Sequence, residues 1–145
     1  MKMKDKTAIV TGGGRGIGRA IALAFAEEGS NIVPVARTES EIKTVAKEAQ
    51  SLGVKALPVK ADVSKESDVY AMVERTMNVF GRIYVLVNNA GAIYREFLKD
   101  LTVGQWDETM AVNLRGTFLC LKAVIGIMME QKSGHIINIS SVSGR

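Results

Sequence analysis

Apolar residues along this chain alternate between short continuous runs and stretches with helical spacing. Five runs have the length and composition of strands: residues 7–10, 31–36, 55–60, 83–87 and 135–140. In four other stretches apolar residues recur every three or four positions, which predicts helices: residues 16–28, 38–52, 64–80 and 112–131. Strands that are apolar throughout and separated by helices are typical of a parallel sheet covered on both faces.

The order of these elements predicts an α/β fold with a doubly wound, Rossmann-like parallel sheet. Right-handed connections between successive strands give the expected strand order 3-2-1-4-5. A looser segment lies between the fourth strand and the last helix. The sequence shows no repeat, linker or second domain, so we expect residues 1–145 to form a single domain.

The predicted helix 112–131 carries two adjacent apolar stripes. One stripe would suffice to cover the sheet. A second stripe therefore indicates either a deeply buried helix or contact with another helix or subunit. The stripes consist of Leu114, Phe118, Leu121, Ile125 and Met128, and of Thr117, Cys120, Val124 and Ile127.

Composition narrows the class of protein further. A chain that is 47% hydrophobic and 23% charged has the composition of a folded globular domain, not of a disordered one. The longest uninterrupted apolar run, residues 20–26, is much shorter than the roughly 20 residues that span a bilayer, so we expect no membrane segment. The single cysteine, Cys120, cannot form an internal disulfide, which favours a cytoplasmic location.

The net charge of +4 is spread evenly along the chain. Residues 1–72 contain 11 Lys and Arg against 9 Asp and Glu, and residues 73–145 contain 8 against 6, so each half carries +2. Without a basic cluster or arm, we expect no nucleic-acid partner. A modest positive charge still favours a ligand that carries phosphate.

A glycine-rich turn, TGGGRGIG at residues 11–18, lies between the first predicted strand and the first helix. Backbone that passes close to a pyrophosphate requires residues without a Cβ, and a helix N-terminus offers free N–H groups to the phosphates. The spacing Gly12-x-x-x-Gly16-x-Gly18 differs from the ordinary dinucleotide-binding pattern. The turn therefore predicts a phosphate site, with a tight strand–helix connection as the alternative.

Together with four further motifs, this turn resembles the short-chain dehydrogenase/reductase family, and in particular its 3-oxoacyl-acyl-carrier-protein reductase-like members. The resemblance extends from about Thr7 to Gly144, nearly the whole chain. The further motifs are Asp62-Val63, NNAG at residues 88–91, Asn113, and INISSVSG at residues 137–144.

The resemblance implies a role for each matching residue. Asp62 would bind the adenine amino group, with Val63 against the base. Ser141 would hold the substrate carbonyl, and Asn113 would order a water in the proton relay, so these two residues are the predicted catalytic ones. The predicted cofactor-binding residues are Gly12, Gly14, Arg15, Gly16, Ile17, Gly18, Arg37, Asp62, Val63, Asn89, Ala90 and Gly91. No metal ligand is expected.

The end of the second strand bears on the choice of cofactor. A site for NAD(H) usually places a carboxylate there to bind the ribose 2′-hydroxyl. This chain has Arg37 at that place, and no acid occurs before Glu39. Arg37 and Arg15 suit a 2′-phosphate, so we predict NADP(H) over NAD(H). The alternative is that both arginines are solvated surface residues.

The family's acid–base pair, Tyr-x-x-x-Lys, is expected about a dozen residues after Ser141, and the chain ends at Arg145. None of the tyrosines present has a lysine four residues later: Tyr70, Tyr84 and Tyr94. We therefore expect this sequence to lack the C-terminal strands and helices of the full family fold and to be inactive alone.

The sequence thus predicts an NADP(H)-dependent oxidoreductase that acts on a small-molecule carbonyl or alcohol. The alternative is a nucleotide-binding or self-associating module without catalysis. Because a fifth strand at a sheet edge and a second apolar stripe would both be uncovered, we expect a homo-oligomer through helix 112–131 or strand 135–140.

Overall fold

The computed structural model describes residues 1–142, so Ser143 and Gly144 of the last motif lie outside the described residues. Its strands form one parallel sheet in the order β3-β2-β1-β4-β5, which confirms the predicted topology. The strands are β1 (Thr7–Thr11), β2 (Asn31–Ala36), β3 (Val59–Lys60), β4 (Val85–Asn88) and β5 (His135–Asn138). The helices are α1 (Gly16–Glu27), α2 (Glu39–Ser51), α3 (Glu66–Phe80), α4 (Val103–Met110), the π-helical η1 (Ala111–Arg115) and α5 (Gly116–Gln131).

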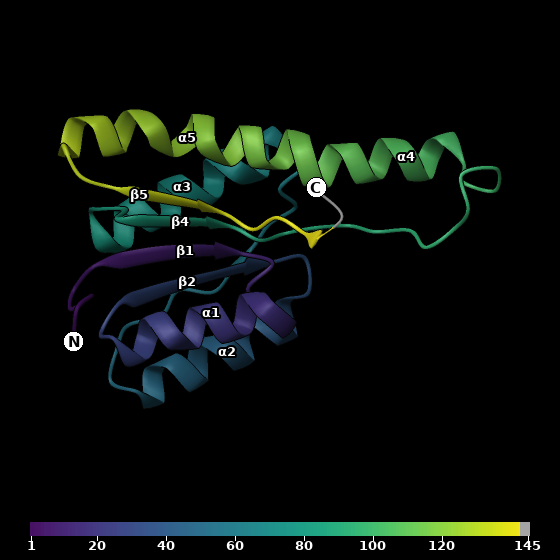
Figure 1. The fold of residues 1–145 in the computed structure, drawn as a ribbon. Coiled ribbons are helices and arrows are strands. Elements are labelled where there is room, and N and C mark those ends of the chain that lie inside the picture. Colours follow the sequence, from purple (N-terminus) through teal and green to yellow (C-terminus); the bar gives the residue numbers. More distant parts are fainter. Residues whose placement is uncertain (143–145) are drawn as a thin grey trace.

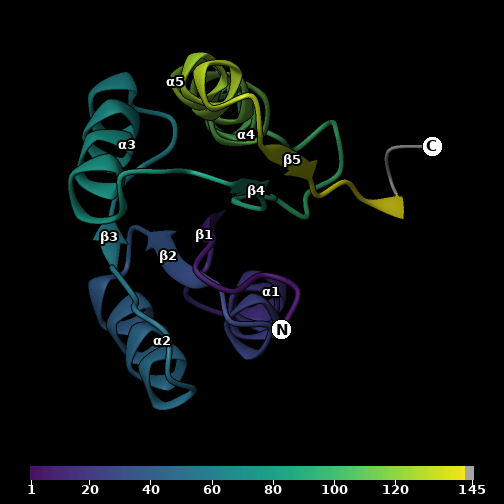
Figure 2. The ribbon, with the colours of Figure 1, turned by 90° about the vertical axis from the view of Figure 1, so that its left-hand side faces the viewer.

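Helices cover both faces of the sheet, with α1 and α2 on one side and α3 and α5 on the other (Figure 2). Alternate residues of the strands therefore enter different cores. Ile9 packs in the cluster beneath α3 and α5, whereas Ala8 and Val10 pack in the cluster beneath α1 and α2. Burial on both faces explains why the strands are apolar throughout.

The parallel arrangement brings the carboxyl ends of the strands to one edge of the sheet (Figure 1). The glycine-rich turn follows β1 at this edge, and the NNAG motif lies at the end of β4. Residues 91–102 then extend beyond the sheet before the chain enters α4 (Figure 1). Segments far apart in the sequence therefore meet at this edge, where ligands bind in open α/β sheets.

The long helix begins earlier than predicted, at Val103 instead of about Val112. Thr102 caps it: the Thr102 hydroxyl accepts the Gln105 backbone N–H at 3.1 Å, and the Gln105 side chain accepts the Thr102 N–H at 2.9 Å. This is a capping box, which satisfies N–H groups that a helix start would otherwise leave unpaired. The helix then continues through α4, η1 and α5 to Gln131.

Two smaller predictions near β3 were wrong. The third strand spans only Val59–Lys60, preceded by an isolated bridge between Ile32 and Ala56, because Pro58 has no N–H to donate to the ladder. Ser64 does not start the next helix, since α3 begins at Glu66. Its side chain is engaged with a carboxylate described below.

The two apolar stripes of the long helix have different environments. Cys120 and Val124, from the second stripe, are buried, and burial raises the pKa of the Cys120 thiol to about 12. From the first stripe Met128 is buried, but Leu114 and Phe118 are 61% and 57% exposed. The helix therefore covers the sheet with one side and leaves apolar side chains on another.

Within the described residues, the continuous helix Val103–Gln131 is long and apolar enough, by length and composition alone, to cross a membrane. An 18-residue window in it has a mean hydropathy of 1.5 and is 33% buried. Polar residues interrupt this window, so it does not form an uninterrupted apolar run. The core helix of a soluble protein meets the same criterion, so the absence of a membrane segment stays a prediction.

Candidate functional site

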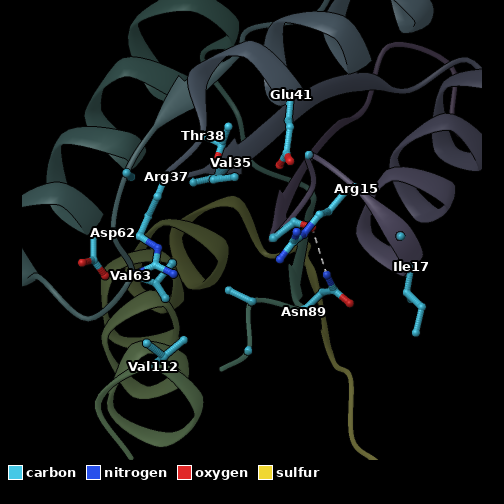
Figure 3. Close-up of a pocket in the computed structure, with 17 residues that line it drawn as sticks. Arg15, Ile17, Val35, Arg37, Thr38, Glu41, Asp62, Val63, Asn89 and Val112 are labelled. Atoms are coloured by element: carbon cyan, nitrogen blue, oxygen red, sulfur yellow. Dashed lines mark hydrogen bonds between the residues drawn. The ribbon is translucent and has the colours of Figure 1, made fainter. Parts of the chain in front are cut away.

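A cavity of about 360 Å³ lies at the carboxyl ends of β1, β2 and β4 (Figure 3). All predicted cofactor-binding residues except Gly18 line it. The complete lining consists of Gly12, Gly14, Arg15, Gly16, Ile17, Val35, Ala36, Arg37, Thr38, Glu41, Ala61, Asp62, Val63, Asn89, Ala90, Gly91 and Val112. Residues from three separate sequence motifs, together with Arg37, thus converge on one cavity.

The glycine-rich turn is shaped by close backbone contacts. Gly12 has φ +61°, and a Cβ there would lie 2.9 Å from the Asn89 Nδ2 atom. Gly18 is buried, and a Cβ at that position would collide with the Gly12 carbonyl oxygen. Gly18 is therefore needed to bring the first turn of α1 against the end of β1, although it does not line the cavity.

The start of α1 is open to an anion. Arg15 is its N-cap residue, and no side chain among the described residues caps the helix. The first N–H groups of a helix have no partner within the helix and carry its positive dipole end, so they attract phosphate. Among the residues of this turn, Ile17 is 65% exposed and points away from the other lining side chains (Figure 3).

Thr11 and Asn89 join the ends of β1 and β4. The buried Thr11 hydroxyl accepts the backbone N–H groups of Asn89 and Ala90, at 3.0 and 3.1 Å, and donates to the Val87 carbonyl at 3.3 Å. The Asn89 side chain donates to the carbonyls of Thr11 and Gly12, at 3.1 and 3.2 Å. The NNAG motif therefore holds the glycine-rich turn in place.

Four charged side chains line the cavity: Arg15, Arg37, Glu41 and Asp62. Arg37 extends toward Asp62 and Val63 (Figure 3). Glu41, on the first turn of α2, was not predicted to be a site residue. Its Oε2 atom lies 3.1 Å from where a Cβ on Gly14 would be. The sequence did not indicate that Glu41 lines the cavity, because the direction of its side chain depends on how α2 packs against the rest of the fold.

Asp62 accepts hydrogen bonds from Ser64, with the hydroxyl at 2.7 Å and the backbone N–H at 3.0 Å. This is an Asx turn, in which an Asp side chain bonds the backbone two residues further along the chain. Burial favours a higher pKa for Asp62, but the two Ser64 hydrogen bonds and the charges of Arg37 and Lys65 outweigh it and lower the pKa. Asp62 is therefore ionised and faces the cavity.

The two predicted catalytic residues are placed differently. Asn113 lies on η1, where its side chain accepts the Ala92 N–H at 2.7 Å and donates to the Ala92 carbonyl at 2.9 Å. Asn113 therefore fixes the chain just after the NNAG motif. Ser141 is exposed on the segment after β5 and is not among the described residues that line the cavity.

The fold is an open, doubly wound α/β sheet with a cavity at the carboxyl ends of its strands, which is the arrangement of dinucleotide-binding domains. A family model described as short chain dehydrogenase matches residues 6–145. The chain belongs to the short-chain dehydrogenase family.

Curated relatives of the chain are described as oxidoreductases or reductases. An uncharacterized oxidoreductase of Staphylococcus aureus (strain MRSA252) is 38% identical over 142 residues, which is 98% of this chain and 61% of the relative. A 3-oxoacyl-[acyl-carrier-protein] reductase of Staphylococcus epidermidis (strain ATCC 35984) is 40% identical over 141 residues, 97% of this chain and 58% of the relative. The chain thus spans about three fifths of the length of these relatives.

Solved structures have the same fold. A metagenomic short-chain oxidoreductase in complex with NADP is 36% identical with a TM-score of 0.94, over 100% of this chain and 66% of that one. An NAD⁺-bound xylitol dehydrogenase is 33% identical with a TM-score of 0.93, over 99% of this chain and 56% of that one. Similar structures therefore bind either nicotinamide cofactor.

Proposed function

We propose that this chain binds NADP(H) in the cavity at the ends of β1, β2 and β4, as part of an oxidoreductase that interconverts a carbonyl and an alcohol. The observation that carries the proposal is the convergence of the glycine-rich turn, Arg37, the Asp62-Val63 pair and the NNAG motif on one cavity. The solved short-chain oxidoreductase in complex with NADP supports it by analogy.

The residues present fit a dinucleotide. The uncapped start of α1 would offer its free N–H groups to the pyrophosphate. Glycine at positions 12 and 18 allows the turn to be this tight, because a Cβ at Gly12 would crowd Asn89 and one at Gly18 would collide with the Gly12 carbonyl. Asp62 and Val63 would contact the adenine, and Asn89, Ala90 and Gly91 the ribose. When bound, the nicotinamide would supply the hydride that the reaction transfers.

The preference for NADP(H) over NAD(H) rests on charge. Arg37 lies where a 2′-hydroxyl site would need a carboxylate, and Arg15 lines the same cavity. A guanidinium forms charge-assisted, often bidentate hydrogen bonds to phosphate. Glu41 also lines the cavity and opposes an anion, so the preference depends on Arg37.

Substitution of Arg37 tests this assignment. We expect Arg37→Asp to lower the affinity for adenosine 2′,5′-bisphosphate at least tenfold, with little change for adenosine 5′-monophosphate, because a contact to a charged group is lost and a repulsion is added. Arg82→Asp makes the same change at an exposed position before β4, at the opposite edge of the sheet. An unchanged preference in Arg37→Asp would refute the NADP(H) assignment.

The proposed substrate is a small carbonyl or alcohol, in keeping with the 3-oxoacyl-[acyl-carrier-protein] reductases among the relatives. Ser141 would bind the carbonyl oxygen, and Asn113 would support the proton relay. Because no tyrosine in the sequence has a lysine four residues later, we propose that the 145-residue chain alone binds nucleotide without oxidising NADPH.

We also propose that the chain self-associates. The long helix exposes a row of large apolar residues, and the outer edge of β5 has no strand partner among the described residues. Surfaces of this kind favour association of subunits. The exposed apolar residues of the helix are Val103, Trp106, Leu114, Phe118, Ile125 and Met129. A cytoplasmic location stays a prediction from the single cysteine.

A further inference from the structure

Glu108 connects the cavity-lining Arg37 to Tyr94. Its Oε1 atom lies 3.9 Å from Arg37 Nη1, and its Oε2 atom accepts a short hydrogen bond from the Tyr94 hydroxyl. Glu108 lies on α4, about one helical turn before the cavity-lining Val112. The side of the long helix that meets the cavity therefore carries Glu108 as well.

Arg37 is thus placed between two carboxylates. Asp62 lies within the cavity lining, and the positive charge of Arg37 is one of the factors that lower the Asp62 pKa. Glu108 does not line the cavity and approaches Arg37 from α4. The side chains of Arg37 and Glu108 are 66% and 42% exposed, so the ion pair is partly solvated and can be displaced by a stronger anion.

We propose that Glu108 sets the selectivity of this site, because its carboxylate competes with a nucleotide 2′-phosphate for the Arg37 guanidinium. The inference rests on the proposed function, which assigns the 2′-phosphate to Arg37. A carboxylate beside Arg37 neutralises part of its charge and repels a dianionic phosphate that approaches the same group. A nucleotide with a free 2′-hydroxyl has no charge there, so Glu108 leaves its binding unchanged.

Tyr94 positions Glu108 for this role. Its hydroxyl occupies Glu108 Oε2 and so leaves Oε1 directed to Arg37. The hydrogen bond to Glu108 raises the pKa of Tyr94, which keeps the phenol protonated as a donor. Tyr94 belongs to the segment that follows the NNAG motif, and this segment is therefore linked to the arginine that distinguishes the two cofactors.

The experiment measures dissociation constants of adenosine 2′,5′-bisphosphate and adenosine 5′-monophosphate by calorimetry on the 145-residue chain and its variants. These two probes differ only in the 2′-phosphate. We expect Glu108→Gln to tighten binding of the bisphosphate by roughly two- to fivefold, as for loss of a surface ion pair, with the monophosphate unchanged. The gain should shrink as salt is raised, because salt screens the charge of Glu108.

Asp107→Asn is the matched control. It removes the same charge from the adjacent residue, which lines a different groove together with Leu114 and Phe118. We expect the ratio of the two dissociation constants to stay at its wild-type value in this variant. Thermal unfolding of each variant verifies that it is folded.

The outcomes separate the inference from the proposed function. If wild type prefers the bisphosphate and Arg37→Asp removes that preference, but Glu108→Gln leaves the ratio unchanged, then only the role of Glu108 is refuted. Weaker bisphosphate binding in Glu108→Gln would also refute it, because Glu108 would then orient Arg37 for the phosphate. If wild type shows no preference for the bisphosphate, the NADP(H) assignment and the inference both fail.

Discussion

Asn89 donates two hydrogen bonds to Thr11: its backbone N–H donates to the Thr11 hydroxyl at 3.0 Å, and its side-chain amide donates to the Thr11 carbonyl at 3.1 Å. One residue ends β1 and the other follows β4, 78 positions later. The relationship ties the glycine-rich turn to the NNAG motif, so the stability of the sheet and the shape of the cavity depend on the same contacts.

Replacement of Thr11 by Val tests this dependence. The variant keeps the volume of the side chain but leaves the N–H groups of Asn89 and Ala90 without their acceptor. We expect the free energy of unfolding to fall by about 1–3 kcal/mol, with weaker nucleotide binding. Chemical denaturation and calorimetry measure the two effects.

Thr11→Ser is the control, because it retains the hydroxyl and loses only a methyl group. We expect most of the hydrogen-bond network to survive in it. Equal destabilisation by Ser and Val would assign the effect to packing of the methyl group instead of the hydroxyl.

Gly18→Ala tests the close contact between α1 and the end of β1. A Cβ at Gly18 would collide with the Gly12 carbonyl, which is backbone and cannot move without shifting the turn. We expect destabilisation of roughly 1–3 kcal/mol, as for overpacking, and loss of nucleotide binding. In Gly104→Ala, the same change meets only the Thr102 hydroxyl oxygen, 3.9 Å away, so stability should be unchanged or slightly raised. Similar melting temperatures for the two variants would contradict the structure of the turn.

The strand order and most of the residues that line the cavity could be predicted from the sequence, because the succession of apolar runs and helices indicates the order and the motif positions indicate the lining residues. The start of the long helix at Val103 was missed, although Thr102 and Gln105 form a recognisable capping-box pair. Other features depend on tertiary packing. The π-helical segment carries Asn113, whose side chain bonds to Ala92 across 21 positions, and no local pattern indicates such a contact. The contribution of the neighbouring Val112 to the cavity lining is likewise visible only in the folded chain.

Asp62 predicts a dependence of stability on pH. Burial favours a higher pKa, but the Ser64 hydrogen bonds and nearby cations outweigh it, so the folded-state pKa is lowered. The resulting stabilisation is present above the unfolded pKa of about 3.9, and it is lost as the pH falls through the lower folded-state value. Because Asp62 is partly solvated, this stabilisation amounts to at most about 1 kcal/mol.

Ser64→Ala removes the hydroxyl that donates to Asp62 and serves as the test. We expect the variant to be less stable than wild type near neutral pH, with the two converging as the pH falls through the lowered folded-state pKa of Asp62. Melting temperatures measured across this range give the comparison. A constant difference down to the lowest pH would show that Ser64 acts through packing, not through the carboxylate.

Phe118 offers the sharpest test of self-association through the long helix. It is 57% exposed and lines a groove with Met110 and Leu114, so a charge there would be costly in an apolar interface but not in a monomer. We expect Phe118→Glu to shift the chain toward monomer in sedimentation equilibrium, with the melting temperature of the monomer unchanged. Val79→Glu places the same charge on α3, at a residue that is also 57% exposed, and should leave the association constant at its wild-type value. Association that persists unchanged in Phe118→Glu would exclude this face and leave the edge of β5 as the contact, because an unpaired strand edge associates through backbone hydrogen bonds that a distant side chain does not affect.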